Sequence, residues 1–506
     1  MTAHLPAPLR LRPDQRRDLV LATQKLLTDA YCHLPQKRAR YGADPVVRLQ
    51  RMLDSGDHTR RGPAAERLFV DEYLTVLHGL RDLHTGLTFT DPRRRERVAA
   101  LPVYIERYGA GTRASYVITK TSGAFRDERR VARGMRVTHW NGVPIEVAVT
   151  RLAGRTRGAN PAAALARALE HLTIRPLDEY LEPDEDWVTL TLDEAGDVRM
   201  EWQYLGAAAL RPSRDQERAV ASTALGLDHD GLANQTAKQV MFSTNTQPAG
   251  SFLKAQTRTV LRRRVGYLRI YSFLPPNLAT ALDEVVAALR GFADDGCTGL
   301  VVDVRNNPGG SIALAENVLG LLVPDVRRVR FSLAATPLTR ALADASADLE
   351  GWRVSLASAA TTGDGFSAAL PITAAVEAVP VTDLPAVLIT DATTYSAGDI
   401  FAAGWADNGV GPIVGAADTT GAGGANVWTV TQLLARLPEG TTDFPLPPGL
   451  DLRFAVRRAL RAGPSEGLPI EDLGIAPQVV HVMQRDDVLG ANEPLVRAAV
   501  RLLPRA

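Results

Sequence analysis

The sequence predicts an α/β protein of several domains: a helical N-terminal part, a β-rich middle part and a C-terminal part with a mainly parallel sheet. The chain has 506 residues, which is too long for one hydrophobic core and indicates two to four domains. Apolar residues recur at helical spacing over 12–95, short strand-like runs occupy 100–207, and strands alternate with helices from residue 264 onward. That last alternation is typical of a parallel sheet.

The N-terminal domain, residues 1–98, is predicted to be a small helical bundle. Leucines between positions 19 and 27 recur near a 3.6-residue period, and Pro35 interrupts the pattern. A second helix is predicted over 63–83, since its first residue is a proline, which suits the first helical turn. The bundle is expected to end at the run Asp-Leu-His-Thr-Gly of residues 82–86.

The next domain, residues 99–207, is predicted to be β-rich. Residues 187–192 alternate between apolar and polar side chains, as in a half-buried strand. The pair Asn141-Gly142 between apolar segments predicts a tight turn. Residues 208–262 are polar and weakly periodic, so we expect a linker or an irregular insertion there.

The last domain, residues 263–506, is predicted to carry the α/β sheet. Strands are expected at 266–270, 299–304 and 386–390, and helices at 278–292, 311–322 and 396–405. Functional side chains of such a sheet gather beyond the carboxyl ends of its strands. Catalytic residues are therefore expected in the turns that follow these strands.

The composition excludes several classes of function. Hydrophobic residues make up 45% and charged residues 23%, as in soluble globular proteins. The net charge of +1 provides no electrostatic field for nucleic acid or an acidic membrane. No apolar run reaches the roughly 18 residues that span a bilayer, and residues 1–21 lack an apolar stretch followed by a small-residue cleavage site. We expect a cytoplasmic protein without membrane or nucleic-acid partners, and an oligomer stays open.

The residues call for no metal and no organic cofactor. Cys32 and Cys297 form neither a metal-binding spacing nor a disulfide framework, and we expect two buried, reduced thiols. The run Asp-His-Asp-Gly at 228–231 is only faintly similar to a calcium loop, because the later ligands are missing.

Ser396, in the run Thr-Tyr-Ser-Ala-Gly-Asp, is the best candidate for a nucleophile. It follows a buried strand and opens a helix, where free N–H groups and the helix dipole favour developing negative charge. A strand–serine–helix arrangement suits acyl transfer. The alternative is that Ser396 only caps the helix, as serine often does. The run differs from the Gly-x-Ser-x-Gly elbow, since Thr394 replaces the first glycine.

A glycine pair follows the strand expected at 299–304. Two glycines after a proline can turn a backbone N–H toward a carbonyl oxygen, so Gly309 or Gly310 is a candidate for an oxyanion hole, with the N–H of Ala397 as its partner. The alternative is an ordinary turn between a strand and a helix.

Three segments together resemble the S41 family, the C-terminal processing or tail-specific peptidases. They are GYLRI at 266–270, DVRNNPGG at 303–310 and TTYSAGDIFAAGWADNGVGPIVG at 393–415, in the order that the family shows. The resemblance covers residues 264–490 and is weaker over 100–207. It implies a catalytic domain of ClpP/crotonase-like fold and a cofactor-free serine peptidase that acts on polypeptides near their C-termini.

The lysine content separates the two catalytic styles of this family. In one style the serine pairs with a lysine in a Gly-Lys-Gly turn, but the matching stretch 415–424 has no lysine and none follows Lys254. The other style resembles the tricorn core and the retinoid-binding-protein branch, which use a histidine from an N-terminal helical segment. The Asp-Leu-His-Thr of 82–85 resembles the Asp-Gly-His-Thr signature of that branch, so His84 is the expected general base. Alternatively, His84 only neighbours a helix end.

The resemblance also implies supporting residues. Glu471 matches a carboxylate that orients the histidine, although a structural surface carboxylate is the alternative. Leu83 stands where the tricorn enzyme has a serine, which leaves Thr85 as a substitute hydroxyl. Asp407 matches an acidic position of the lysine-type enzymes and is expected to be structural or supporting. Asp399 is expected to brace the turn at the nucleophile.

The segment 134–145 resembles a strand and turn of PDZ modules. Such modules add a peptide as a strand and hold its terminal carboxylate with free N–H groups. The main rival to a peptidase is an inactive S41-like protein that binds a peptide or an apolar ligand. A scaffold that depends on its PDZ-like domain alone is a further alternative.

Overall fold

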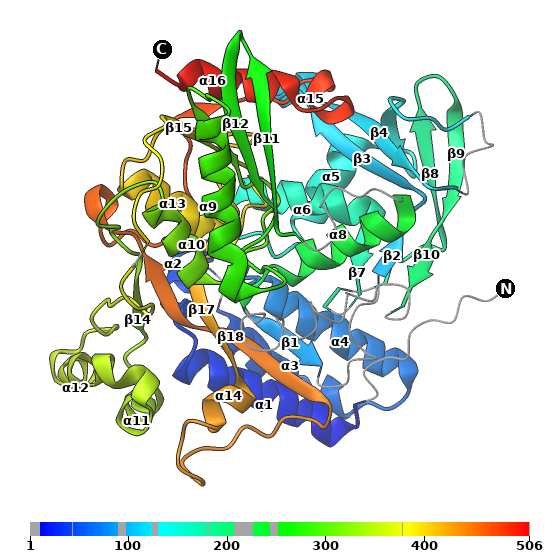
Figure 1. Cartoon of the computed structure of the whole chain (residues 1–506). Coiled ribbons are helices and arrows are strands. Elements are labelled where there is room, and N and C mark those ends of the chain that lie inside the picture. Colours follow the sequence, from blue (N-terminus) through cyan, green and yellow to red (C-terminus); the bar gives the residue numbers. More distant parts are fainter. Residues whose placement is uncertain are drawn as a thin grey trace.

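The computed structural model describes residues 11–42, 44–89, 98–123, 130–177, 179–180, 182–206, 226–242, 251–376 and 378–504. Within these ranges, four sheets and the helices around them form the molecule shown in Figure 1. The N-terminal helices lie at one end, and a six-stranded parallel sheet lies beside an antiparallel sheet at the other, with a four-stranded sheet between the two ends. The prediction of a mixed α/β architecture is confirmed.

The N-terminal helices begin where the sequence supplies prolines. They are α1 (Pro13–Asp29), α2 (Leu34–Tyr41), α3 (Pro45–Asp54) and α4 (Pro63–His78), each with a proline in its first turn. Proline costs no helical hydrogen bond at that place. Helix α4 ends at His78 and not at residue 83, because Gly79 follows and Arg81 has a positive φ of 52°. His84 therefore lies in a turn that leads into strand β1 (Gly86–Phe89).

The middle part is built around an antiparallel sheet. Its strand order is β3-β4-β5-β8-β9, with β6 paired to β5. The bounds are β3 (Val103–Tyr108), β4 (Ser115–Thr121), β5 (Arg136–Trp140), β6 (Val143–Pro144), β8 (Trp187–Leu192) and β9 (Gly196–Glu201). Asn141 and Gly142, both at positive φ, form the predicted tight turn. Helices α5 (Ile145–Ala153) and α6 (Pro161–Thr173) pack on this sheet around one buried apolar cluster.

The six-stranded sheet of the C-terminal part confirms the predicted parallel arrangement. Its order is β11-β12-β13-β15-β16-β19, and only the edge pair β11–β12 is antiparallel. The bounds are β11 (Leu253–Val260), β12 (Arg263–Ile270), β13 (Leu300–Asp303), β15 (Ala386–Thr390), β16 (Ile413–Gly415) and β19 (Val479–Val480). Helices α9 (Leu278–Asp294), α10 (Ile312–Gly320) and α13 (Ala397–Asp407) belong to one apolar cluster against the sheet. Helix α16 (Glu493–Leu502) contributes to a second cluster with other side chains of the same strands.

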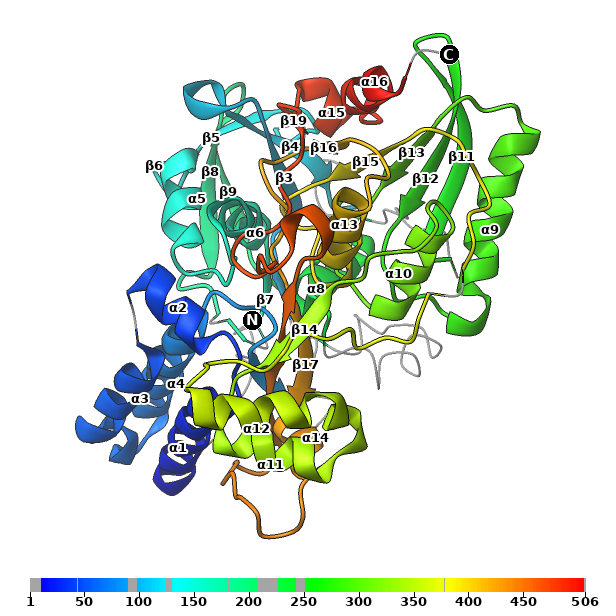
Figure 2. The same cartoon turned by 90° about the vertical axis from the view of Figure 1, so that its left-hand side faces the viewer.

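A four-stranded antiparallel sheet joins the two ends of the chain. Strand β18 (Leu450–Leu460) pairs with β1, β14 (Arg330–Leu333) and β17 (Ala425–Thr429). Figure 2 shows β14 and β17 of this sheet near the middle of the molecule. Because Gly86 of β1 lies opposite Arg453 of β18, the turn that carries His84 is fixed against the C-terminal part (Figure 1). This pairing explains how a residue of the N-terminal segment reaches the α/β sheet.

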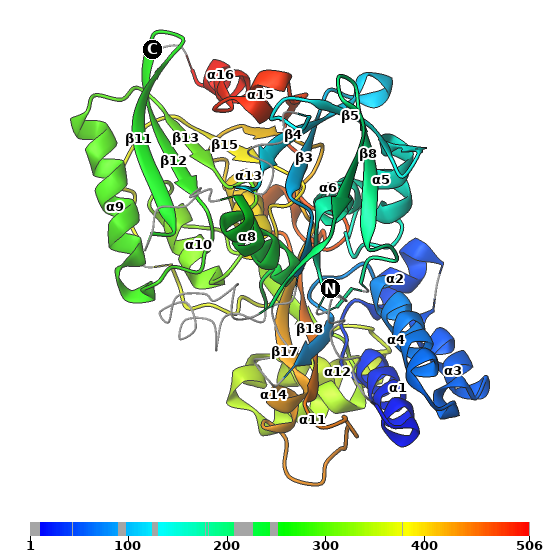
Figure 3. The same ribbon diagram turned by 90° about the vertical axis from the view of Figure 1, so that its right-hand side faces the viewer.

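The segment 208–262, where the sequence indicates a linker or an insertion, contains regular structure. Helix α8 (His229–Phe242) packs near strands β2 (Val98–Ala100) and β7 (Ile174–Pro176), and β11 already belongs to the large sheet (Figure 3). The buried positions of α8 recur at helical spacing, but Asp230 and Asn234 among them are polar. An apolar period therefore does not reveal this helix. Residues 207–225 and 243–250 lie outside the described residues.

The remaining elements surround these sheets. They are β10 (Gln203–Leu205), α11 (Pro337–Ala345), α12 (Arg353–Thr362), α14 (Val430–Leu434), α15 (Arg485–Leu489) and the 3-10 helices 57–59, 111–113, 347–352 and 463–465. Both cysteines are buried and free, as expected. In the described ranges, no helix is long and apolar enough to cross a membrane.

Candidate active site

Ser396 occupies a strained turn between β15 and α13. Its φ of 57° and ψ of −119° are unusual for a residue with a side chain, and such strain is often found at functional sites. The side chain is buried and caps no N–H group of α13, so the capping alternative is wrong. Tyr395 N–H donates to the carbonyl of Asn307 at 2.9 Å, which ties this turn to the loop after β13.

His84 and Ser396 meet at one backbone oxygen. His84 Nε2 lies 3.1 Å from the carbonyl oxygen of Gly226, and the hydroxyl of Ser396 donates to the same oxygen. A carbonyl oxygen only accepts, so Nε2 must carry the ring hydrogen in this arrangement. Nδ1 is then an acceptor and lies 3.4 Å from the hydroxyl of Tyr395. Residues that directly precede β1, α8 and α13 thus converge on one point.

Charged side chains anchor the Gly226 carbonyl in this position. Asp228 donates its N–H to the carbonyl of Pro308 at 2.9 Å and accepts from Arg167 at 2.6 Å. Asp230 pairs with Arg157 at 2.9 Å. The acidic residues of the faint calcium-like run are therefore bound by buried arginines, and α8 is fixed beside the nucleophile.

The two candidate glycines differ in their availability for an oxyanion hole. Gly309 N–H donates to the side-chain oxygen of Asn307 at 2.9 Å. Within the described residues, the N–H groups of Gly310 and Ala397 have no acceptor. Gly309 nevertheless shapes the site, because at its φ of 100° a Cβ would lie only 2.6 Å from Cβ of Ser396.

Asp399 stabilises the turn that carries Ser396 through hydrogen bonds of its side chain. Its carboxylate accepts from the N–H groups of Ala422 at 3.1 Å and Gly423 at 2.7 Å, and it is also bonded to Thr420 and to the N–H of Ser396. Burial raises the pKa of Asp399 to about 7. Asp399 thus connects the helix of Ser396 to the glycine-rich stretch where lysine-type relatives are expected to carry their base.

Asp407 forms an ion pair with Arg461, away from the hydrogen bonds of Ser396 and His84. It lies in the last turn of α13, and Arg461 Nε donates to its Oδ2 at 3.1 Å. This ion pair joins α13 to the end of β18.

Behind His84, the buried carboxylate of Asp82 organises the turn. Its Oδ1 accepts from the backbone N–H of His84 at 2.8 Å, and its Oδ2 accepts from Tyr31 at 2.8 Å and from Thr85 at 3.0 Å. Burial opposes ionisation, but the hydrogen bond and charge of His33 outweigh it and hold the pKa of Asp82 far below its usual range. Burial lowers the pKa of His84 to about 4, so the imidazole is neutral at neutral pH and can accept a proton.

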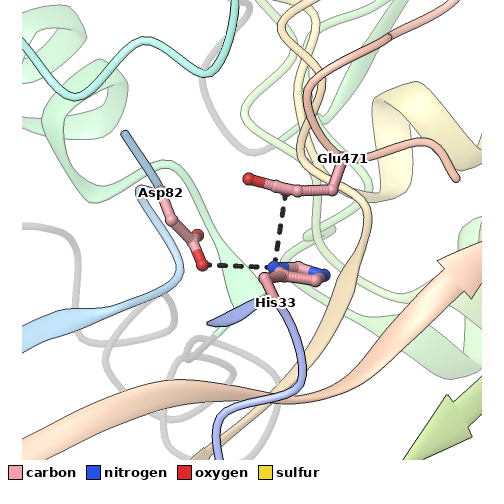
Figure 4. Close-up of side chains that lie close together, drawn as sticks. All are labelled: His33, Asp82 and Glu471. Carbon is pink, nitrogen blue, oxygen red and sulfur yellow. Dashed lines mark hydrogen bonds and ion pairs between the residues drawn. The ribbon is translucent and has the colours of Figure 1, made fainter. Parts of the chain in front are cut away.

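Glu471 is fully buried, which contradicts the surface alternative. Its Oε1 lies 2.6 Å from Nζ of Lys37, and its Oε2 accepts from Gly424 N–H at 3.2 Å. Oε2 also lies 4.0 Å from Nδ1 of His33 (Figure 4). In the described part of the chain it has no contact with His84 itself. Burial raises the pKa of Glu471 to about 7 in spite of the nearby Lys37.

His33, Asp82 and Glu471 lie close enough to suggest a metal site, since one ligand atom of each lies within 4.8 Å of the others. Their neighbours argue against it. The ammonium of Lys37 is bonded to Glu471, and Tyr31 and Thr85 donate to Asp82. These oxygen atoms therefore already have cationic or hydrogen-bonding partners, which suits a network of ion pairs.

Several of these residues were missed by the sequence analysis: Tyr31, His33, Lys37, Asp82, Gly226 and Tyr395. Asp82 and Tyr395 could have been found, because each lies within two positions of a predicted catalytic residue. Lys37 lies on α2, and its partners lie beyond residue 470, so no local pattern indicates their contact.

The family comparison agrees with this geometry. Residues 264–480 match the model of Peptidase family S41. This match covers less than half of the chain, and it confirms the expected resemblance to that family over these residues. The matched part of the chain is therefore similar to a serine-type peptidase, which is a hydrolase.

Known proteins extend the comparison beyond this domain. A carboxyl-terminal-processing protease from Synechocystis sp. is 26% identical over 157 residues, which are 31% of this chain and only 32% of that relative. Mature CPAF, and mature CPAF complexed with lactacystin, are each 17% identical with a TM-score of 0.68. The alignment with the lactacystin complex covers 97% of this chain and 98% of that chain. The alignment with mature CPAF alone covers 97% of this chain and 96% of that chain. The fold of nearly the whole chain is thus similar to that of CPAF.

Proposed function

We propose that this protein is a serine endopeptidase that cleaves polypeptides through an acyl-enzyme on Ser396, with His84 as the general base. The observation that carries the proposal is the meeting of Ser396 Oγ and His84 Nε2 at one carbonyl oxygen, that of Gly226. Two side chains that both reach a peptide carbonyl have the spacing that nucleophile and base need around a scissile bond.

The reaction then follows the chemistry of acyl transfer. His84 Nε2 takes the proton of Ser396 while Oγ forms a bond to the substrate carbonyl carbon. The N–H groups of Gly310 and Ala397, which have no acceptor among the described residues, hold the resulting oxyanion. The imidazolium gives its proton to the leaving amine as the peptide bond breaks. Water then attacks the ester, with His84 again as the base.

The resting arrangement has to change before this reaction starts. As long as Nε2–H and the hydroxyl of Ser396 both donate to Gly226, the histidine cannot accept the hydroxyl proton. The carbonyl of Gly226 therefore has to leave, which makes room for the substrate carbonyl and frees Nε2. Lys37 does not replace His84, because it is bonded to Glu471, Asp472 and the carbonyl of Arg81.

The PDZ-like part supports capture of a peptide, which we propose to include a free C-terminus. A hollow of about 420 Å³ lies between β4, β5 and the start of α5, lined by side chains that include Tyr116, Val137 and Ile145. Fluorescent peptides with a free or an amidated C-terminus test this point, since equal affinity for both would contradict it.

Hydrolysis of a fluorescently labelled, unfolded protein tests the proposed function. We expect Ser396→Ala and His84→Ala to remove activity. Matched controls are Ser332→Ala, a buried serine bonded to Arg458, and His78→Ala, a half-buried histidine bonded to the carbonyl of Glu179. Both controls should stay active. Activity that survives in Ser396→Ala would contradict the proposal, and a wild type without activity would favour the inactive, ligand-binding alternative.

A further inference from the structure

We propose that Tyr395, the residue before the nucleophile, is the positioning residue of the general base and holds the imidazole of His84 through Nδ1. This inference rests on the proposed function, because it assigns the group that orients the base of that reaction. It gives the tyrosine hydroxyl the place that a carboxylate occupies in a Ser-His-Asp triad.

The contact between the two side chains is direct. Tyr395 Oη lies 3.4 Å from Nδ1 of His84, and the ring centroids are 4.7 Å apart with a tilt of 39°. The nearest carboxylates serve other groups: Asp82 accepts the backbone N–H of His84, and Glu471 binds Lys37 and Gly424. Within the described residues, Tyr395 is therefore the one hydrogen-bond partner of Nδ1.

The tyrosine ring is held firmly enough to position a neighbour. A Cβ on Gly423 would lie 2.4 Å from Cε2 and Cζ of the ring, so the absence of a side chain there leaves the space that the ring fills. A Cβ on Gly421 would lie 3.1 Å from Cδ2 of the same ring. The guanidinium carbon of Arg167 lies 5.6 Å from the ring centroid. The glycine-rich stretch that stands in place of the lysine turn of other relatives thus packs against the ring of Tyr395.

A phenol suits this place because it can both donate and accept. In the resting arrangement Nε2 carries the hydrogen, and Tyr395 donates to the bare Nδ1. When Gly226 leaves, solvent water takes the proton of Nε2 and returns one proton to Nδ1, so the ring and the solvent keep their charge. Nδ1–H then donates to Oη, and Nε2 is free for the proton of Ser396. A carboxylate could hold only the second of these two states.

The surroundings keep Tyr395 in its phenol form. Burial raises the pKa of Tyr395 well above its ordinary value, and the charges of Glu471 and Asp82 raise it further. This gives Glu471 and Asp82 an indirect role, since their negative charge favours a hydroxyl that keeps its proton next to the base.

The substitution Tyr395→Phe tests this inference, with hydrolysis of the labelled protein as the assay. The ring stays and only the hydroxyl is lost, so we expect kcat to fall about tenfold, as for the loss of one buried hydrogen bond, while KM stays within about twofold of the wild type. The control is Tyr73→Phe, which removes a buried hydroxyl that lies 2.7 Å from Thr23 Oγ1 in the helical bundle. It should leave both constants unchanged.

The outcomes separate this inference from the proposed function. Activity in Ser396→Ala overturns the proposed function. An inactive Ser396→Ala together with an unchanged kcat in Tyr395→Phe overturns the role of Tyr395 alone. If Tyr395→Phe does not fold, 3-fluorotyrosine at position 395 takes its place, since it keeps the shape and makes the hydroxyl a weaker acceptor. A lower kcat at unchanged KM supports the inference, and an unchanged kcat overturns it.

Discussion

Replacing Lys37 by methionine is the sharpest test of the buried charges behind the catalytic histidine. Nζ of Lys37 lies 2.6 Å from Oε1 of Glu471 and is also bonded to Asp472, and only 2% of its side chain is exposed. Methionine keeps most of the apolar stem, so Lys37→Met mainly removes the charge. Two buried carboxylates then lose their cation.

The expected loss of stability depends on pH in a defined direction. In the wild type the pKa of Glu471 is already raised to about 7, so both proteins keep its proton at pH 5 and this group adds little to the loss there. Above pH 7 the wild type ionises Glu471 beside Lys37, whereas the variant has to hold the proton at a cost of about 1.4 kcal/mol for each further pH unit. The loss of stability should therefore be about 2 kcal/mol larger at pH 8.5 than at pH 5.

Urea unfolding at pH 5 and pH 8.5, followed by tryptophan fluorescence, measures this difference. The matched control is Lys25→Met, whose partner Asp29 lies at 3.1 Å in a pair with side chains 38% and 33% exposed. Exposed pairs contribute less than about 1 kcal/mol, so this control should change little at either pH. A loss below about 1 kcal/mol for Lys37→Met at pH 8.5, or a loss that is equal at both pH values, would refute the reasoning.

Two further substitutions test the surroundings of Ser396. Gly309→Ala places a Cβ 2.6 Å from Cβ of Ser396 and should lower kcat/KM about 100-fold, since a small displacement of reacting groups has that effect. Gly142→Ala, at φ 74° with nothing within 4 Å, is its control and should keep full activity; equal activity of the two variants would contradict this account. Asp399 has its folded pKa raised to about 7 by burial, so its stabilising contribution is full at low pH and is lost as pH rises toward 7. The difference in unfolding free energy between wild type and Asp399→Asn should therefore shrink by up to about 1.4 kcal/mol per unit between pH 5 and 7, and a constant difference would argue against a protonated Asp399.

Local chemistry in the sequence predicts the parallel sheet and the position of Ser396. Buried strands such as β13 and β15 stand out as short apolar runs, and the turns after them are marked by glycine or small residues. The close approach of Gly309 to Ser396 follows from that pattern. The pattern does not predict which of the two glycines, Gly309 or Gly310, keeps an N–H group without an acceptor among the described residues. That depends on the hydrogen bond from Gly309 N–H to the side chain of Asn307.

Long-range packing decides what the sequence could not predict. The contact between Lys37 and Glu471 joins an N-terminal and a C-terminal segment, which the pairing of β1 with β18 holds together. No spacing of residues within either segment encodes this contact. Helix α8 was missed because polar groups occupy buried positions, where Asp230 pairs with an arginine. Glu471, which the sequence predicts to orient His84, is buried, but its hydrogen bonds run to Lys37 and Gly424 and not to His84. The orienting role of Glu471, the C-terminal preference and the location in the cell stay predictions.

Covalent labelling with a fluorophosphonate, followed by peptide mapping, tests the central claim most directly. The account predicts one adduct, on Ser396, that is lost in His84→Ala and kept in His78→Ala. An adduct on another residue, or labelling of Ser396 that persists in His84→Ala, would contradict the claim that these two residues form the nucleophile and the base.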